Sequence, residues 1–350
     1  LGVSNRPLVR ILLRRGLDVT GCDATPYEKL DDEILALARD GCRLKTGPGY
    51  LEDLSGDVVF RTPGLHPNRP ELVALKRSGA VITSEMEAFF RVCPCKIIAV
   101  TGSDGKTTTT TLIAEFLKQA GKRVWLGGNI GTPLLPLAEQ MEPDDFAVVE
   151  LSSFQLMDFP LSPHIAVITN LAPNHLDVHK DMDEYVNAKK NVFLHQGPDD
   201  TLVLNMDNAL THAMAAEAPG RILEFSRQSV PENGAYANDG VILWSRHEFK
   251  TLMMPQSDIL LPGLHNVENY LAAICAVQPF VSVRDIRTVA QNFAGVEHRI
   301  ELVRVKDGVR FYNDSIASSP SRTIACLRCF PEKIILIAGG YDKHLPYDAL

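Results

Sequence analysis

The chain has 350 residues, of which 45% are hydrophobic and 22% are charged. These values are ordinary for a soluble globular protein, and the length allows two or three domains. Lys and Arg number 35 against 43 Asp and Glu, so a net charge of -8 argues against nucleic acid or an anionic membrane as partners. No signal peptide and no membrane-spanning apolar run is recognisable among these residues, which together with seven cysteines predicts a reducing, cytoplasmic location.

Residues 1–84 are predicted to form a first α/β domain. Short apolar strands that end at Asp23 and Gly64 alternate with helical segments such as PELVALKRSG. This alternation is typical of a doubly wound parallel sheet, a Rossmann-like arrangement that binds ligands at the carboxyl ends of its strands. Asp23 is therefore either a cap or turn residue or a contact to a ribose or base, and its position favours neither interpretation.

Residues 85–295 are predicted to form a second α/β domain with a parallel sheet. Four short apolar runs end in polar residues, as buried parallel strands do: KIIAV (96–100), FAVVE (146–150), HIAVITN (164–170) and TLVLN (201–205). Residues 296–350 begin a third domain, in which the run IILIA predicts another buried strand. Both ends of the chain interrupt regular patterns, which predicts truncation at each end.

The segment TGSDGKTT lies between the strand KIIAV and a helical pattern, and it nearly spells a phosphate-binding loop. The usual pattern needs a glycine five residues before Gly105, where this chain has Val100, and Gly102 lies inside the loop instead. Backbone N–H groups at the helix start would bind phosphates, with Lys106 reaching the β- and γ-phosphates and Thr107 offering its hydroxyl to Mg²⁺. The alternative is that Gly-Lys-Thr only caps a helix.

Three further residues are candidates for completing a nucleotide site. Glu150 ends a buried strand, where a carboxylate can hold Mg²⁺. His175 follows another strand, although a lone loop histidine is more often structural, and Lys189 could neutralise phosphate or be a solvated helix residue. Cys326 and Cys329 have metal-type spacing without a second pair, so buried free thiols are expected. These residues alone leave open a ligase, a small-molecule kinase or NTPase, and a non-catalytic nucleotide-binding module.

Over essentially its whole length the chain resembles the Mur ligase family. The resemblance rests on the segments TGSDGKTTTT, GGNIGTPL, VVELSSFQL, TNLAPNHLDVH, NAKKNVF, LPGLHNVENYLAA, EHRIE and YNDS. It implies a Rossmann-like domain for a UDP-linked substrate, a central P-loop ATPase domain and a partial Rossmann-like C-terminal domain. It also implies ATP-dependent amide-bond formation through an acyl phosphate in peptidoglycan precursor synthesis. ELSSFQL is most similar to members that add D-glutamate to UDP-N-acetylmuramoyl-L-alanine; another Mur-type amino-acid ligase is the alternative.

The resemblance implies residue roles as well, in a monomer that uses ATP and two Mg²⁺ ions. The implied ATP contacts are Gly102, Ser103, Asp104, Gly105, Lys106, Thr107, Thr108, Asn266, Asn269, Arg299 and Asp314. The implied contacts to the UDP substrate or D-glutamate are Val3, Ser4, Asp23, Ala24, Gly64, Asn129, Ser318 and Lys343. The implied metal ligands are Thr107, Glu150, His175 and a CO₂-derived carbamate on Lys189. The implied catalytic group is Lys106, Glu150, His175, Lys189 and Arg299.

The chain departs from the family pattern in three places. Many relatives carry a lysine where this chain has Ile316, so a positive contact near the nucleotide is missing there. The first domain lacks the strand expected before Leu1, and the third domain lacks positions expected to hold the D-glutamate side chain. One expectation is therefore a fragment that binds nucleotides but does not complete the ligation.

Overall fold

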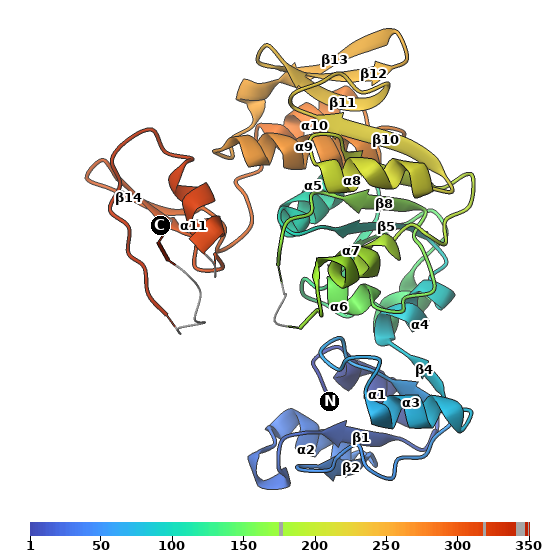
Figure 1. The fold of residues 1–350 in the computed structure, drawn as a ribbon. Helices are drawn as coiled ribbons and strands as arrows, with labels where there is room; N and C mark the ends of the chain where they lie inside the picture. The colour runs from blue at the N-terminus through green and yellow to red at the C-terminus, as the bar shows by residue number, and fades with distance from the viewer. Residues whose placement is uncertain (175–177, 318–319, 341–346, 349) are drawn as a thin grey trace.

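A nine-stranded sheet dominates the computed structural model, which describes residues 1–174, 178–317, 320–340, 347–348 and 350 (Figure 1). The strand order is β13-β12-β11-β10-β9-β8-β5-β7-β6. In this spatial order, all strands from β11 to β6, β5 included, are parallel to one another. Their bounds are β5 Lys96–Thr101, β6 Val124–Gly128, β7 Phe146–Glu150, β8 Ile165–Ile168, β9 Thr201–Asn205, β10 Arg221–Ser226, β11 Asn233–Asn238, β12 Val241–Arg246 and β13 Phe249–Pro255. This sheet confirms the predicted α/β class.

Helices cover both faces of this sheet because alternate strand residues point to opposite sides. Ile98 and Val100 of β5 pack in the cluster formed with α5, α9 and α10, whereas Ile97 and Ala99 pack in the cluster that includes α4 and α7. The helices and short 3₁₀ turns of this region are α4 Glu85–Val92, α5 Lys106–Gln119, η2 Leu135–Gln140, α6 Ser153–Leu156, α7 Met182–Lys190, α8 Ala209–Ala213, η3 Met214–Glu217, η4 Gln256–Asp258, α9 Leu264–Val277 and α10 Val283–Ala290. None of the helices in the described part of the chain is both long and apolar enough to cross a membrane.

The four strands predicted from apolar runs are β5, β7, β8 and β9, and all four are confirmed. Strand β6 and the four strands from β10 to β13 were not predicted from the sequence. These strands mix apolar residues with glycine, asparagine or charge, as in NGAYAN of β11, so no continuous apolar run marks them. Strands β12 and β13 are antiparallel additions to the sheet edge, where one exposed face favours such mixing.

The first domain contains two separate parallel pairs, β1–β2 and β3–β4, where the sequence predicted one sheet. Residues 1 and 2 lie between the pairs: the Leu1 side chain packs on Gly21 of β1, and the Gly2 backbone approaches the Thr62 side chain beyond β3. Strand β3 also ends before the predicted Gly64. The elements are α1 Asn5–Arg14, β1 Thr20–Asp23, η1 Tyr27–Lys29, α2 Asp32–Arg39, β2 Arg43–Thr46, β3 Val58–Phe60, α3 Pro70–Arg77 and β4 Val81–Thr83.

The segment after residue 295 lies beside the central sheet as a separate unit (Figure 1). It consists of the antiparallel pair β14 Glu301–Lys306 and β15 Val309–Asn313, followed by α11 Pro320–Leu327. The predicted buried strand IILIA is wrong, because Ile335 and Ile337 are 94% and 93% exposed and have no strand structure. An apolar run forms a buried strand only where other strands pair with it and helices cover it. Among the described residues, neither a strand nor a helix packs on this run in that way. The domain limits at 84/85 and 295/296 stay predictions.

Candidate nucleotide-binding site

The loop between β5 and α5 has a backbone that only glycine accommodates at two positions. Gly102 has φ 146°, and a Cβ there would collide with the Thr169 hydroxyl. Gly105 has φ 78°, and a Cβ there would collide with the Asn269 side chain. Val100, by contrast, is a fully buried strand residue. The missing first glycine of the usual pattern therefore falls inside the sheet core, and Gly102 makes the early turn.

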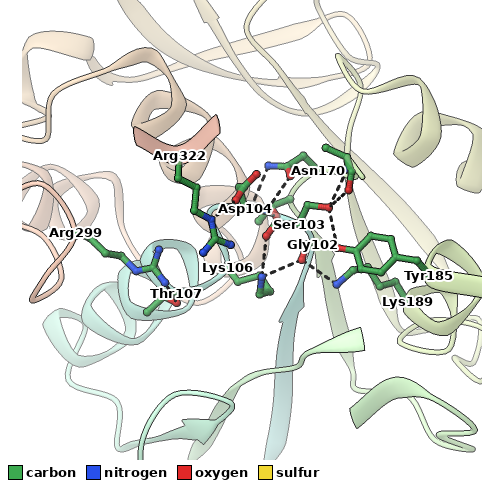
Figure 2. A network of polar contacts seen from close by, with 12 residues as sticks. Gly102, Ser103, Asp104, Lys106, Thr107, Asn170, Tyr185, Lys189, Arg299 and Arg322 are labelled. Carbon is green, nitrogen blue, oxygen red and sulfur yellow. Dashed lines mark hydrogen bonds and ion pairs between the residues drawn. The ribbon is translucent and has the colours of Figure 1, made fainter. Parts of the chain in front are cut away.

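Side chains that follow β8 hold this loop in place (Figure 2). The Thr169 hydroxyl donates to the Asp104 carbonyl at 2.6 Å, and the Asn170 amide donates to the same oxygen at 3.2 Å. The Asn170 side-chain oxygen accepts from the Asp104 N–H at 3.0 Å. Neither residue was predicted as part of the site, although its place at the carboxyl end of a parallel strand was an available signal.

The side chains at the start of α5 meet the carboxylate that ends β7. The Thr107 hydroxyl donates to Glu150 Oε2 at 2.7 Å, and Asn129 Nδ2 donates to Glu150 Oε1 at 2.8 Å. Glu150 is 2% exposed, and Thr108 is buried one position beyond Thr107. Lys106 Nζ donates at 3.0 Å to the carbonyls of Gly102 and Ser103. Burial is the main cause of the lowered pKa of Lys106.

Lys189 approaches the same loop from α7. It is 2% exposed, and its Nζ donates to the Gly102 carbonyl at 2.9 Å and to Thr101 Oγ1 at 3.2 Å. Burial, with the Lys106 charge as a second cause, holds the pKa of Lys189 well below its usual value. Tyr185, one helical turn earlier, bonds Ser103 Oγ through its hydroxyl at 2.9 Å, and its ring lies 4.8 Å from Lys189 Nζ. Tyr185 was not predicted as part of the site, although its i, i+4 spacing to Lys189 was visible in the sequence.

The third segment reaches the loop through Arg299. Its Nη2 donates to Thr107 Oγ1 at 2.9 Å, while its buried Nε has no hydrogen-bond partner among the described residues. Burial lowers the pKa of Arg299. An orphaned guanidinium N–H beside a glycine loop fits a phosphate oxygen, which accepts such donors strongly.

The residues predicted to contact adenine and ribose lie on two elements near the loop, Asn266 and Asn269 on α9 and Asp314 after β15. Asn269 accepts from the Thr109 hydroxyl at 3.3 Å and donates to Asn266 at 3.1 Å, so the start of α9 packs directly against α5. Both asparagines are 5% exposed. Asp314 follows β15 and accepts from the Ile300 N–H at 3.1 Å.

The predicted substrate residues of the first domain lie near the carboxyl ends of its strands. Asp23 ends β1, followed by Ala24, and Gly64 lies beyond β3. Val3 and Ser4 precede α1. Asp23 Oδ1 accepts from the Thr25 N–H at 2.9 Å, which is the turn interaction that the sequence left as one alternative. His175, Ser318 and Lys343 lie outside the described residues.

The residues around Glu150 suit a hard divalent cation. Thr107 Oγ1 and Glu150 Oε2 present two oxygen atoms 2.7 Å apart, and oxygen is the donor type that Mg²⁺ prefers. No cluster of three or more His, Cys, Asp and Glu side chains suited to a metal occurs in the part of the chain that is described. All seven cysteines are free thiols, as expected, but only Cys42, Cys95 and Cys275 are buried, whereas Cys326 and Cys329 are partly exposed.

A glycine loop between a buried parallel strand and a helix, with a carboxylate ending the adjacent strand, defines a nucleotide-binding α/β protein with a P-loop. Residues 100–277 match the Mur ligase middle domain. The UDP-N-acetylmuramoylalanine–D-glutamate ligase of Acetivibrio thermocellus is 53% identical over 351 aligned residues, covering 100% of this chain and 75% of that protein. The ligase of the same name from Clostridium acetobutylicum is 50% identical, covering 100% and 76%. The chain therefore belongs to the Mur ligase family, in the branch that carries this name.

Solved structures of other Mur ligases share the fold at low sequence identity. A murein peptide ligase from Psychrobacter arcticus is 19% identical with a TM-score of 0.55, covering 93% of this chain and 73% of that one. UDP-N-acetylmuramate-alanine ligase from Thermotoga maritima is 19% identical with a TM-score of 0.56, covering 94% and 75%. These similarities confirm the architecture and carry no statement about substrates.

Proposed function

We propose that this protein joins D-glutamate to UDP-N-acetylmuramoyl-L-alanine in an ATP-dependent amide-forming reaction of peptidoglycan precursor synthesis. The observation that carries the proposal is the hydrogen-bonded pair of Thr107 and Glu150 at the end of a phosphate loop whose Gly102 carbonyl accepts from both Lys106 and the buried Lys189. The names of the 50–53% identical relatives supply the substrates.

The proposed chemistry has two steps. The terminal carboxylate of the UDP substrate attacks the γ-phosphorus of ATP, which forms an acyl phosphate and releases ADP. The amine of D-glutamate then attacks the acyl carbon, loses a proton, and phosphate leaves. The protein's task is to hold the phosphates, stabilise the charge that develops on the transferring group, and exclude water that would hydrolyse the acyl phosphate.

The loop residues can perform the first part of this task. Backbone N–H groups at the start of α5 point toward an anion bound there, and the helix dipole favours negative charge. Lys106 Nζ can exchange the carbonyls of Gly102 and Ser103 for phosphate oxygens. Arg299 Nε, which has no partner among the described residues, is a further donor for the same group. Asn266, Asn269 and Asp314 are proposed contacts of the adenosine moiety.

Thr107 and Glu150 are the proposed first ligands of Mg²⁺, supported by their adjacent oxygen atoms. Bound Mg²⁺ would supply positive charge to the phosphates. Asn129 donates to Glu150 and thereby orients the carboxylate, while a direct substrate contact of Asn129 is a separate proposal. His175 is proposed as a ligand of a second ion.

We further propose that Lys189 reacts with CO₂. A neutral amine attacks the carbon of CO₂ and loses a proton, giving a carbamate with two oxygen donors. The burial of Lys189 and its lowered pKa favour the neutral amine that this reaction needs. The modified side chain would replace a cation with an anion suited to a divalent ion.

The remaining parts of the proposal concern the two outer domains. The residues proposed to contact the uridine nucleotide are Val3 and Ser4 before α1, Asp23 and Ala24 at the end of β1, and Gly64 beyond β3. Ser318 and Lys343 are proposed to contact D-glutamate. The protein is proposed to act as a monomer.

An ADP-release assay with UDP-N-acetylmuramoyl-L-alanine, ATP and a panel of amino acids tests the function. We expect release that depends on both D-glutamate and the UDP substrate. Equal turnover with L-alanine, a diamino acid or a dipeptide would reassign the protein within the family. Stable phosphate transfer to an acceptor with no amide product would indicate a kinase instead.

A further inference from the structure

Arg322 of α11 reaches the phosphate loop from the third segment (Figure 2). Its Nε donates to Asp104 Oδ1 at 3.0 Å, across 218 residues of sequence. The Arg322 side chain is 29% exposed and the Asp104 side chain is 53% exposed. The ion pair therefore lies at the open side of the loop, in contact with both solvent and the loop.

The position of Arg322 relates it to the phosphates and not to the adenosine moiety. Asp104 lies between Gly102 and Gly105, in the turn that leads into the start of α5, where backbone N–H groups favour an anion. Lys106 Nζ donates to the carbonyls of Gly102 and Ser103, the two residues that precede Asp104 in the same turn. Through its bond to Asp104, Arg322 therefore lies at the turn that Lys106 also contacts.

We propose that Arg322 is a substrate-binding residue of the ligase, which exchanges the Asp104 carboxylate for the terminal phosphate of ATP. An exposed ion pair contributes little to stability, so this exchange has a small cost. A phosphate group offers more negative charge and several oxygens to the planar guanidinium, which binds phosphate through two N–H groups at once. The exchange also ties the third segment to the nucleotide at the group where the reaction occurs.

This proposal rests on the proposed ATP-dependent function and adds a residue to it. The competing explanation is that Arg322 only holds the third segment to Asp104. The two differ in what happens when Asp104 is neutralised. If Arg322 binds phosphate, replacing it weakens ATP binding in an Asp104→Asn variant as well. If Arg322 only pairs with Asp104, replacing it has no effect on ATP binding in that variant.

The test is calorimetric titration of the ligase with ATP and with ADP. Arg322→Gln should weaken ATP binding about tenfold, by analogy with other charge-assisted phosphate contacts, and ADP binding less than twofold. Arg322→Lys should recover part of the loss. Arg328→Gln, which changes an exposed arginine just beyond the same helix, should bind both nucleotides like the unaltered protein. The tenfold effect should persist in the Asp104→Asn background.

Three results would overturn the proposal. They are unchanged ATP binding by Arg322→Gln, equal weakening of ATP and ADP, and loss of the effect in the Asp104→Asn background. Thermal unfolding of each variant separates a binding defect from a folding defect, and Arg322→Lys supplies a second, milder variant. Failure of the unaltered ligase to bind ATP would instead refute the proposed function.

Discussion

The two sides of the candidate site differ in how firmly the fold holds them. The phosphate loop joins β5 to α5 inside the nine-stranded sheet, and its residues are fixed by Thr169, Asn170 and Tyr185. The third segment has only the pair β14–β15 and α11, and apolar side chains such as Val303 and Phe311 are exposed. Its described polar contacts with the loop are made by Arg299 and Arg322.

This difference separates two contributions to catalysis. A loop built into a sheet core can bind phosphates with little rearrangement, which is the preorganisation that electrostatic catalysis requires. A segment held by few contacts can move toward or away from the nucleotide and thereby open and close the site. Substitutions on the loop side should therefore affect both stability and activity, and substitutions on the third segment should affect activity alone.

The largest expected effect is at Glu150. Glu150→Ala should lower kcat/KM about 10³-fold or more, since the variant loses the proposed metal carboxylate and the partner of Thr107. Unfolding should also become easier by roughly 1–3 kcal/mol, because the buried Thr107 hydroxyl loses its acceptor; the exposed Asn129 can turn to water instead. Glu150→Gln retains one acceptor and should recover stability but not activity. Full activity in either variant would contradict the assignment.

A slightly smaller effect is expected at Lys189. Lys189→Ala should lose activity by about 10²-fold to 10³-fold, and a short-chain carboxylate should restore part of it by supplying the missing oxygen donors. Lys190→Ala is the matched control, because Lys190 is the adjacent residue and pairs with Glu217 away from the loop. An unaffected Lys189→Ala variant would remove this residue from the mechanism.

Substitution of Arg299 tests the third segment. Arg299→Ala should lower kcat/KM by about 10²-fold, because it removes the guanidinium beside Thr107 and the phosphates. Its free energy of unfolding should change by less than about 0.5 kcal/mol, because loss of the hydrogen bond to Thr107 is offset by removal of a buried guanidinium N–H that has no described partner. Loss of stability comparable to that of Glu150→Ala would show that the third segment is as firmly integrated as the loop.

The last prediction concerns stability, and not activity, on the loop side. Burial raises the pKa of Glu85 to about 7, and its Oε1 accepts from the Leu135 N–H at 3.0 Å. The folded state therefore binds an extra proton between the ordinary Glu pKa of about 4.3 and 7, so this group makes stability fall as pH rises through that window.

Glu85→Gln keeps the acceptor without the charge and should be more stable at pH 8 by up to about 3 kcal/mol. The gain should vanish near pH 4, and denaturant unfolding at the two pH values measures it. Glu139→Gln, at an exposed position of η2, should show no such pH dependence. Equal stability of Glu85→Gln and the unaltered protein at pH 8 would contradict the assigned burial cost.

The sequence predicted the loop side of the site more completely than the rest. Strands β5, β7, β8 and β9 are continuous apolar runs, so their ends placed Lys106, Thr107 and Glu150 near one another. The contacts from Asn170 and Tyr185 to the loop depend on side-chain direction, which strand and helix patterns do not encode. Arg322 lies 218 residues from Asp104, and such a tertiary contact has no local signal.

The apolar run IILIA shows the opposite error, a strand that the sequence predicted and that the structure does not contain. Its composition is that of a buried strand, yet Ile335 and Ile337 are almost fully exposed. Burial depends on neighbours that a local pattern does not contain. Sequence patterns were therefore most reliable where the fold surrounds a strand on both faces, as it does β5.

The central claim is that the loop and the third segment direct a carboxylate, and not water, to the γ-phosphorus of ATP. UDP-N-acetylmuramoyl-L-alanine labelled with ¹⁸O in its terminal carboxylate tests this directly, with the released phosphate analysed by mass spectrometry. Attack by the carboxylate predicts that an ¹⁸O atom from the substrate appears in the phosphate of each ligation cycle. Unlabelled phosphate released together with the amide product would contradict an acyl phosphate intermediate and the account built on it.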